Sequence, residues 1–242
     1  MKNILLLLFT TAAFAQPPVS ISSDRPGVSI GTAVVGKKVF QIESGYEFNK
    51  SNQGNSEVEN SFINNVLRYG LGEKYELSTS FDYNSLNDED STLGNFQVGG
   101  RVNLYTPKKG VLPTVTLQSR LQFYDSLGEK TDNIESITTL SSVFDLKEYG
   151  AITVNIIMSD ISSDSLELST YIASWSRDLS DELNFFIEYY ANKSGSKYKS
   201  SWDTGFGYLL NKDTWLDISF GTDLESEYSS KFYALGFSWR KL

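Results

Sequence analysis

The stretch Tyr75-Glu76-Leu77-Ser78-Thr79-Ser80-Phe81-Asp82-Tyr83 alternates apolar or aromatic side chains with polar ones. Successive side chains of a β-strand point to opposite faces, so this alternation predicts a strand with one apolar and one polar face. The same period of two residues returns from Val39 onward, and it is clearest in residues 40–48, 96–104, 115–123, 183–189, 202–210 and 216–221. It is weaker between Glu135 and Ser176. The sequence therefore predicts an all-β protein of about twelve strands, each long enough for a tilted membrane-spanning strand.

The connections between these strands alternate in length. The long, polar ones are Asn49–Glu59, Asn84–Leu93, Asp125–Ile134, Asn192–Ser200 and Leu224–Ser230, and the short ones are Gly72–Lys74, Thr106–Leu112, Lys147–Glu148, Asp178–Glu182 and Asn211–Asp213. Bacterial outer-membrane barrels have short periplasmic turns and longer extracellular loops. We therefore predict that residues 38–242 form a closed, antiparallel, up-and-down transmembrane β-barrel. Aromatic residues near the strand ends, among them Tyr69, Trp215 and Trp239, are expected to form girdles at the two membrane interfaces.

The N-terminal region has a different character. Residues 1–15 combine a basic start, an apolar run from Ile4 to Phe9 and the small-residue pattern Ala13-Phe14-Ala15, which is typical of a cleavable signal peptide. Residues 16–37 hold three prolines and no sustained alternation. Proline disfavours strand pairing, so we expect this stretch to be irregular, either as a periplasmic tail or as a plug-like segment in the barrel mouth. The predicted location is the outer membrane of a Gram-negative cell.

Composition excludes several kinds of function. The chain has no cysteine and no histidine, which removes disulfides, Cys- or His-ligated metals and Ser-His-Asp hydrolases. A formal net charge of −9 argues against nucleic acid as a partner. No nucleophile paired with a base is visible, so we predict no enzymatic activity, no catalytic or metal-binding residues and no cofactor.

Several short motifs, in order along the chain, resemble one known family. They are Ser23-Asp24-Arg25-Pro26, residues 41–46, residues 67–71 followed by Glu76-Leu77, residues 187–190, residues 203–205 and residues 216–218. These segments resemble the outer-membrane barrel "transporter" family named for the MetA pathway of phenol degradation. The C-terminus departs from the usual pattern, because Arg240-Lys241-Leu242 follows Trp239. The resemblance implies a barrel of about this size that moves hydrophobic or aromatic compounds.

The polar faces of the predicted strands carry charges of both signs into the lumen. The candidate lumen and selectivity residues are Glu43, Glu47, Arg68, Glu76, Asp82, Arg101, Arg120, Glu188, Asp203 and Asp217. They form either a charged constriction that selects solutes or an ion-pair network that fills the lumen. Barrels of about eight strands are packed shut and those of about 16–18 strands are open, so a width of about twelve does not decide between these interpretations.

The leading hypothesis is a channel or transporter for small solutes, with hydrophobic or aromatic compounds suggested by the resemblance. Its expected partners are outer-membrane lipid, the barrel-assembly machinery during biogenesis and a small-molecule solute. Two alternatives remain open. One is a non-conducting barrel with a structural or surface role, and the other is a soluble periplasmic all-β binding protein, because outward faces such as Leu216, Ile218 and Phe220 could also form the core of a sandwich.

Overall fold

A computed structural model describes residues 19–53, 56–86, 92–108, 110–123, 134–159, 167–194, 197–224 and 230–242. The predicted signal peptide, residues 1–15, lies outside these ranges, as does most of the predicted loop Asp125–Ile134. The strands are β1 Phe40–Gln53, β2 Ser56–Gly70, β3 Tyr75–Leu86, β4 Thr92–Tyr105, β5 Thr114–Phe123, β6 Ile134–Asp145, β7 Ala151–Ser159, β8 Glu167–Asp178, β9 Leu183–Ser194, β10 Lys197–Asn211, β11 Thr214–Asp223 and β12 Ser230–Lys241. A short 3-10 helix, Lys147–Tyr149, joins β6 to β7.

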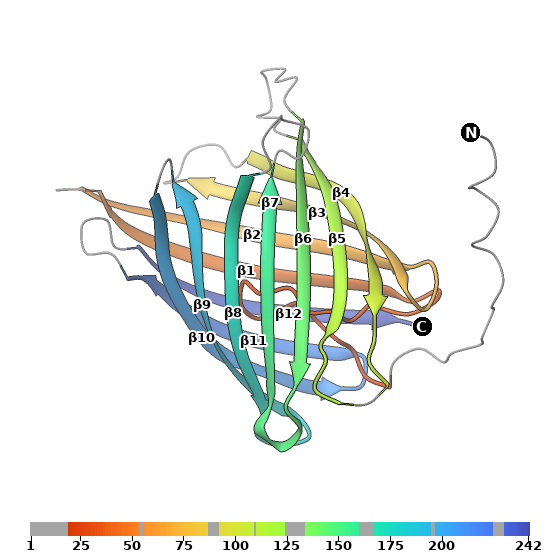
Figure 1. Cartoon of the computed structure of the whole chain (residues 1–242). Helices are drawn as coiled ribbons and strands as arrows, with labels where there is room; N and C mark the ends of the chain where they lie inside the picture. The colour runs from red at the N-terminus through yellow and green to blue at the C-terminus, as the bar shows by residue number, and fades with distance from the viewer. Residues whose placement is uncertain are drawn as a thin grey trace.

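These strands form a closed antiparallel barrel (Figure 1). Each strand pairs with its neighbours in sequence, and β1 pairs with β12 from Phe40 opposite Lys241 to Ser51 opposite Ser230. Closure leaves no open sheet edge, so every strand has a hydrogen-bonding partner on both sides. The predicted fold class, an up-and-down barrel of about twelve strands, is confirmed.

The two ends of the barrel differ. At one end, here called the turn end, short connections join β2 to β3, β4 to β5, β6 to β7, β8 to β9 and β10 to β11, and β1 begins and β12 ends there. The opposite end is called the loop end. Two of the long loops predicted there are largely strand, because β1 and β2 stay paired out to Gln53 opposite Ser56, and β9 and β10 out to Ser194 opposite Lys197. Polar sequence was misleading at these points, since strands that extend beyond an apolar band need no apolar face.

The barrel is polar inside and apolar outside. Buried polar side chains such as Gln41, Glu76 and Asn155 face the lumen, whereas large apolar side chains such as Leu77, Ile218 and Leu235 are more than half exposed on the outer surface. This inverts the arrangement of a soluble protein and is what lipid contact requires. Trp215, predicted in an interfacial girdle, instead lines the lumen beside Ile21. The described residues contain no helix long and apolar enough to cross a membrane.

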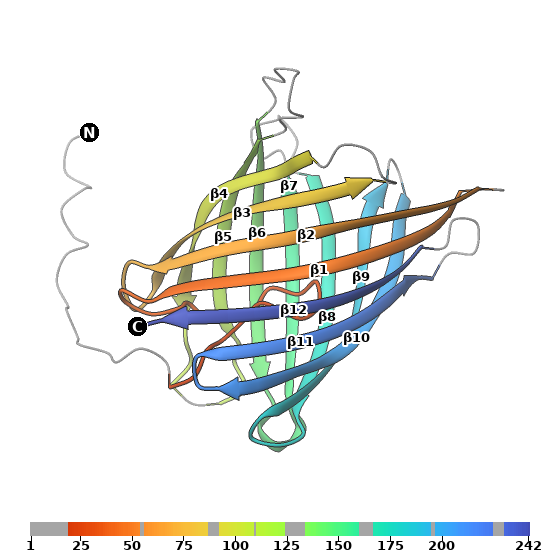
Figure 2. The same ribbon diagram turned by 180° about the vertical axis from the view of Figure 1, so that it is seen from behind.

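Residues 19–38 form an irregular trace that enters the barrel from the turn end and returns there before β1 begins, and Val19 at its start is 92 % exposed (Figures 1 and 2). Backbone hydrogen bonds fix both ends of this lumen segment. The Ile21 amide donates to the carbonyl of Lys212 in the β10–β11 turn, and the Lys38 amide donates to the carbonyl of Gly70 at the end of β2. Of the two placements considered for residues 16–37, the described part lies within the lumen.

Candidate functional site

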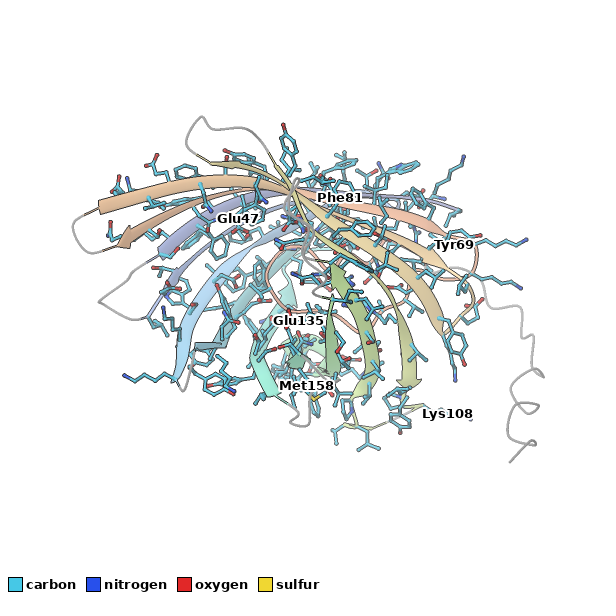
Figure 3. The ribbon with its side chains drawn as sticks, turned by 90° about the horizontal axis from the view of Figure 1, so that it is seen from above. Glu47, Tyr69, Phe81, Lys108, Glu135 and Met158 are labelled. Atoms are coloured by element: carbon cyan, nitrogen blue, oxygen red, sulfur yellow. The ribbon has the colours of Figure 1, made fainter. Side chains whose placement is uncertain are left out.

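All ten candidate lumen residues lie on inward-facing strand positions, and the pairing of the strands determines which of them lie at the same level along the barrel axis. Gln41 pairs with Arg68, Glu76 with Arg101, and Glu188 with Asp203. Side chains opposite each other on paired strands are neighbours on one face of the sheet. Seen from above, Glu47 on β1 and Glu135 on β6 lie on opposite walls (Figure 3). The structure separates the ten residues into an arginine cluster, a set bound to the lumen segment and a set without ion pairs.

The arginine cluster lies on β1–β5. Arg68 forms ion pairs with Glu43 at 2.8 Å and Glu76 at 2.9 Å, and all three side chains are at most 1 % exposed. Arg101 is 3.5 Å from Glu76 and also pairs with Asp24 of the lumen segment. Buried charges of this kind are tolerated only when they are paired and hydrogen-bonded. The cluster therefore fills this side of the lumen instead of lining an open path.

The same arginines hold the lumen segment. The carbonyl of Ala33 accepts hydrogen bonds from Arg68 and Arg101, both at 2.8 Å. Glu76 also accepts the amide hydrogen of Val35 at 2.9 Å. Burial alone would raise the pKa of Asp24, but the Arg101 and Arg68 guanidinium groups outweigh it and lower this pKa to about 2. Asp24 is therefore a carboxylate at neutral pH and anchors the segment to β2 and β4.

Arg25 anchors the segment on the opposite side. Its guanidinium lies 3.2 Å from Asp217 of β11, whose side chain is fully buried. Gly45 and Gly236 pair across β1 and β12, and a Cβ atom on either glycine would overlap the Arg25 side chain. These two glycines form a recess in the wall that only a residue without a side chain can provide.

Glu188 of β9 binds the middle of the segment. It accepts hydrogen bonds from the Val28 amide at 2.7 Å, the Ser29 amide at 3.0 Å and the Ser29 hydroxyl at 2.5 Å. Next to it, the Asn155 side chain accepts from the Ile30 amide at 2.7 Å and donates to the Ile30 carbonyl at 2.9 Å. The segment therefore crosses the lumen from the β2–β5 wall to the β7–β11 wall.

Four further candidate residues, like Glu188, have no ion pair within the part of the chain that the structure describes. Glu47 accepts from Asn49, Asp82 accepts from Asn64 and Asn95, and Arg120 donates to Ser78 and Gln97. Neither carboxylate oxygen of Asp203 has a hydrogen-bond partner among the described residues, although the residue is completely buried. These groups are the charges that the lumen segment and the arginine cluster leave uncompensated.

Cavities lie on both sides of the lumen segment along the β8–β12 wall. One at the turn end, of about 300 Å³, shares Ile21, Asn184 and Trp215 with a second, of about 290 Å³, that reaches Glu188. A third, of about 210 Å³, lies beyond Val28 towards the loop end. The contact of Val28 and Ser29 with Glu188 separates the second from the third.

Sequence reasoning missed the residues that the lumen segment contributes. Asp24 and Arg25 both make ion pairs with lumen candidates, yet they have no alternation to mark them as inward-facing. The one signal was the motif Ser23-Asp24-Arg25-Pro26, which was used only for the resemblance. Asn155 and Gln118 were also missed, since they are uncharged and Asn155 lies in the region of weak alternation.

The closed twelve-stranded barrel with a polar lumen defines the class of protein, and solved structures with a similar fold include outer-membrane channels and porins. The outer membrane channel COG4313 from Pseudomonas putida F1 is 11 % identical with a TM-score of 0.61, over 89 % of this chain and 100 % of that one. The NanC porin is 11 % identical with a TM-score of 0.56, over 84 % and 100 % of the two chains. The KdgM porin is 9 % identical with a TM-score of 0.54, over 81 % and 98 %. At these identities the likeness establishes the fold.

A family model described as "Putative MetA-pathway of phenol degradation" matches residues 23–240. The chain belongs to this family, which confirms the resemblance drawn from the motifs. No curated protein sequence matches the chain.

Proposed function

We propose that this protein is an outer-membrane channel for small solutes whose lumen is narrowed by residues 19–38. The observation that carries the proposal is the presence of cavities along the β8–β12 wall on both sides of the contact of Val28 and Ser29 with Glu188. A barrel filled for strength alone would have no need of cavities on both sides of one contact. Porin-like folds among the solved structures support the same conclusion.

In this proposal the turn end faces the periplasm and the loop end faces the outside, as in outer-membrane barrels generally. The exposed apolar side chains of the outer face contact lipid, and the barrel-assembly machinery inserts the chain. The non-conducting alternative draws on the ion pairs of Asp24 and Arg25, which hold the lumen segment on both walls. Conductance separates the two functions.

The test is single-channel recording of the detergent-folded protein in a planar bilayer, with a heat-modifiable gel shift to show that the barrel is folded. We expect discrete, reproducible current steps. Silence from protein that is demonstrably folded would overturn the channel and leave the structural role.

A second measurement asks whether the lumen segment must move. The Ser23 and Ser238 hydroxyl oxygens are 2.8 Å apart, so cysteines at these positions lie close to the geometry of a disulfide. The chain has no other cysteine, so the pair forms without competition. We expect the Ser23→Cys/Ser238→Cys variant to conduct about equally when reduced and when oxidised, because cavities lie beside the docked segment; loss of current on oxidation would show that the segment must move. Each single-cysteine variant, treated with the same oxidant, is the control.

A further inference from the structure

We infer that the channel selects small cationic solutes, which pass along the wall formed by β8–β12 and β1, where carboxylates are left uncompensated. This inference rests on the proposed channel function and specifies its substrate class. It is carried by the charges that line the cavities, by the way the lumen arginines are neutralised, and by one buried carboxylate that lacks a donor.

The cavities along this wall are lined almost entirely by acidic and neutral side chains. The turn-end cavity has Asp178, Asp181 and Glu182 and no lysine or arginine among its described lining residues. The loop-end cavity has Glu47 and Asp223 and, again among the described residues, no cationic side chain. Carboxylates that line a water-filled path favour cations over anions.

The cavity between these two is lined by Arg25, whose positive charge is neutralised by an ion pair. The Arg25 guanidinium pairs with Asp217, which removes one positive and one negative charge from the path together. Asp24 lines the same cavity and pairs with Arg101. What remains is Glu188, whose carboxylate accepts hydrogen bonds from Val28 and Ser29 and makes no ion pair with any described residue.

The remaining lumen arginines are held in ion pairs or lie away from this wall. Arg240 of β12 is 3 % exposed at the turn end, where it pairs with Asp213 and donates to the carbonyls of Val19 and Ser20. Arg68 and Arg101 are at most 3 % exposed and are held in ion pairs on β2 and β4. Arg120 lies on β5, which is on the opposite side of the closed barrel from β11, and donates to Ser78 and Gln97. An anion moving through the cavities would therefore meet carboxylates without meeting a free arginine.

Asp203 adds a second buried acidic group beside Glu188 at the narrow point. It pairs with Glu188 on β9, it is completely buried, and neither of its oxygens has a hydrogen-bond donor among the described residues. A buried carboxylate in this position needs a bound proton or a nearby cation. The described residues contain no group of three or more acidic side chains that could hold a metal ion.

Reversal potentials in a potassium chloride gradient test the inference. One carboxylate about 7 Å from an ion in water favours a cation over an anion by about sevenfold at low salt. We therefore expect potassium to be more permeant than chloride by at least about this factor. The double variant Glu47→Gln/Asp223→Asn should lower the ratio severalfold, and Asp203→Asn should lower it less, because Asp203 is more deeply buried.

Glu57→Gln/Glu59→Gln is the matched control, since it removes two negative charges from exposed positions that pair with Lys50 outside the lumen. Arg120→Gln tests the opposite wall, and its potassium-to-chloride ratio should stay within about twofold of the parent value. Current steps with a preference for chloride, or an unchanged ratio in Glu47→Gln/Asp223→Asn, would overturn the inference and leave the channel standing. No current from folded protein would overturn both.

Discussion

The pair between Arg25 and Asp217 is expected to set how firmly the lumen segment is held, and Arg25→Gln tests it. The substitution removes the only ion pair that Asp217 makes among the described residues, and the Asp217 side chain is fully buried. The twelve-stranded ladder needs no contribution from Arg25, so the barrel should stay folded. The consequence should therefore be release of the segment and not unfolding of the protein.

The free-energy cost of removing the Arg25 charge follows from the burial of its partner Asp217. Removing one partner of a buried ion pair costs about 3–5 kcal/mol, because the other charge is left without compensation. The Arg25 side chain is 17 % exposed and borders a cavity, so the lower figure of about 3 kcal/mol is appropriate. Since about 1.4 kcal/mol corresponds to a tenfold change, the released fraction should rise about 100-fold.

A cysteine at position 21 reports that fraction. Ile21 is 6 % exposed and the chain has no native cysteine, so Ile21→Cys reacts with a maleimide mainly when the segment is released. The labelling rate should rise about 100-fold when Arg25→Gln is added. Adding Asp217→Asn as well should bring the rate back towards that of Ile21→Cys alone, because the uncompensated carboxylate is gone. Lys147→Gln, which removes a charge from an exposed turn, is the control. Equal rates with and without Arg25→Gln would refute the reasoning.

Three further predictions concern the recess, the lipid face and pH. Gly45→Ala should raise labelling at Cys-substituted position 21 without any change of charge, because the added Cβ overlaps Arg25; an unchanged rate would mean that the wall yields instead. Ile218→Arg should lower the free energy of unfolding in vesicles by about 2–4 kcal/mol if Ile218 lies near the bilayer midplane. Asp217→Asn should release the lumen segment and leave the free energy of barrel unfolding nearly unchanged. Equal effects of the two substitutions on unfolding would contradict the assigned outer and inner faces. The pKa of Asp24 is about 2 when docked and 3.8 ordinarily, so docking gains about 2 kcal/mol above pH 4 and loses it as the pH falls towards 2. Amide hydrogen exchange at Gly31, whose N–H donates to Asp24, should therefore be constant from pH 8 to about 5 and accelerate below about 4, after correction for its intrinsic pH dependence.

The alternation of apolar and polar residues was sufficient to predict the barrel, because each side chain of a membrane-spanning strand faces either lipid or the lumen. Residues such as Glu76 and Asp82 could be placed on the inner face, and Leu77 and Phe81 on the outer face, without knowledge of any partner. The ends of β1 and β2 were harder to predict, since both faces of a strand contact water beyond the membrane. The sequence around Lys50 and Glu59, which pair across these two strands, therefore resembles a polar loop.

The partners of the lumen residues could not be predicted from the same pattern. Whether Arg68 selects a solute or closes an ion pair depends on which groups stand across the lumen, and Asp24 and Ala33 belong to a segment with no periodicity. Contacts such as Glu188 with Val28 join residues 160 positions apart. Only the closure of the barrel brings them together.

The charges of the lumen segment explain why the two walls behave differently. Asp24 is the third carboxylate paired with Arg68 and Arg101, after Glu43 and Glu76, and Arg120, which makes no ion pair among the described residues, is the third positive charge of the arginine wall. Arg25, the next residue, neutralises Asp217 on the other wall. Release of the segment would leave the arginine wall with an excess positive charge and the β8–β12 wall with another free carboxylate.

Docking is therefore favoured at both walls at once, and any solute that displaces the segment must compensate opposite charges on opposite sides. A small cation can replace Arg25 at Asp217, but it cannot replace Asp24 at the arginines. Cations should therefore pass beside the docked segment, and a change of conductance on its release should be accompanied by weaker discrimination against anions.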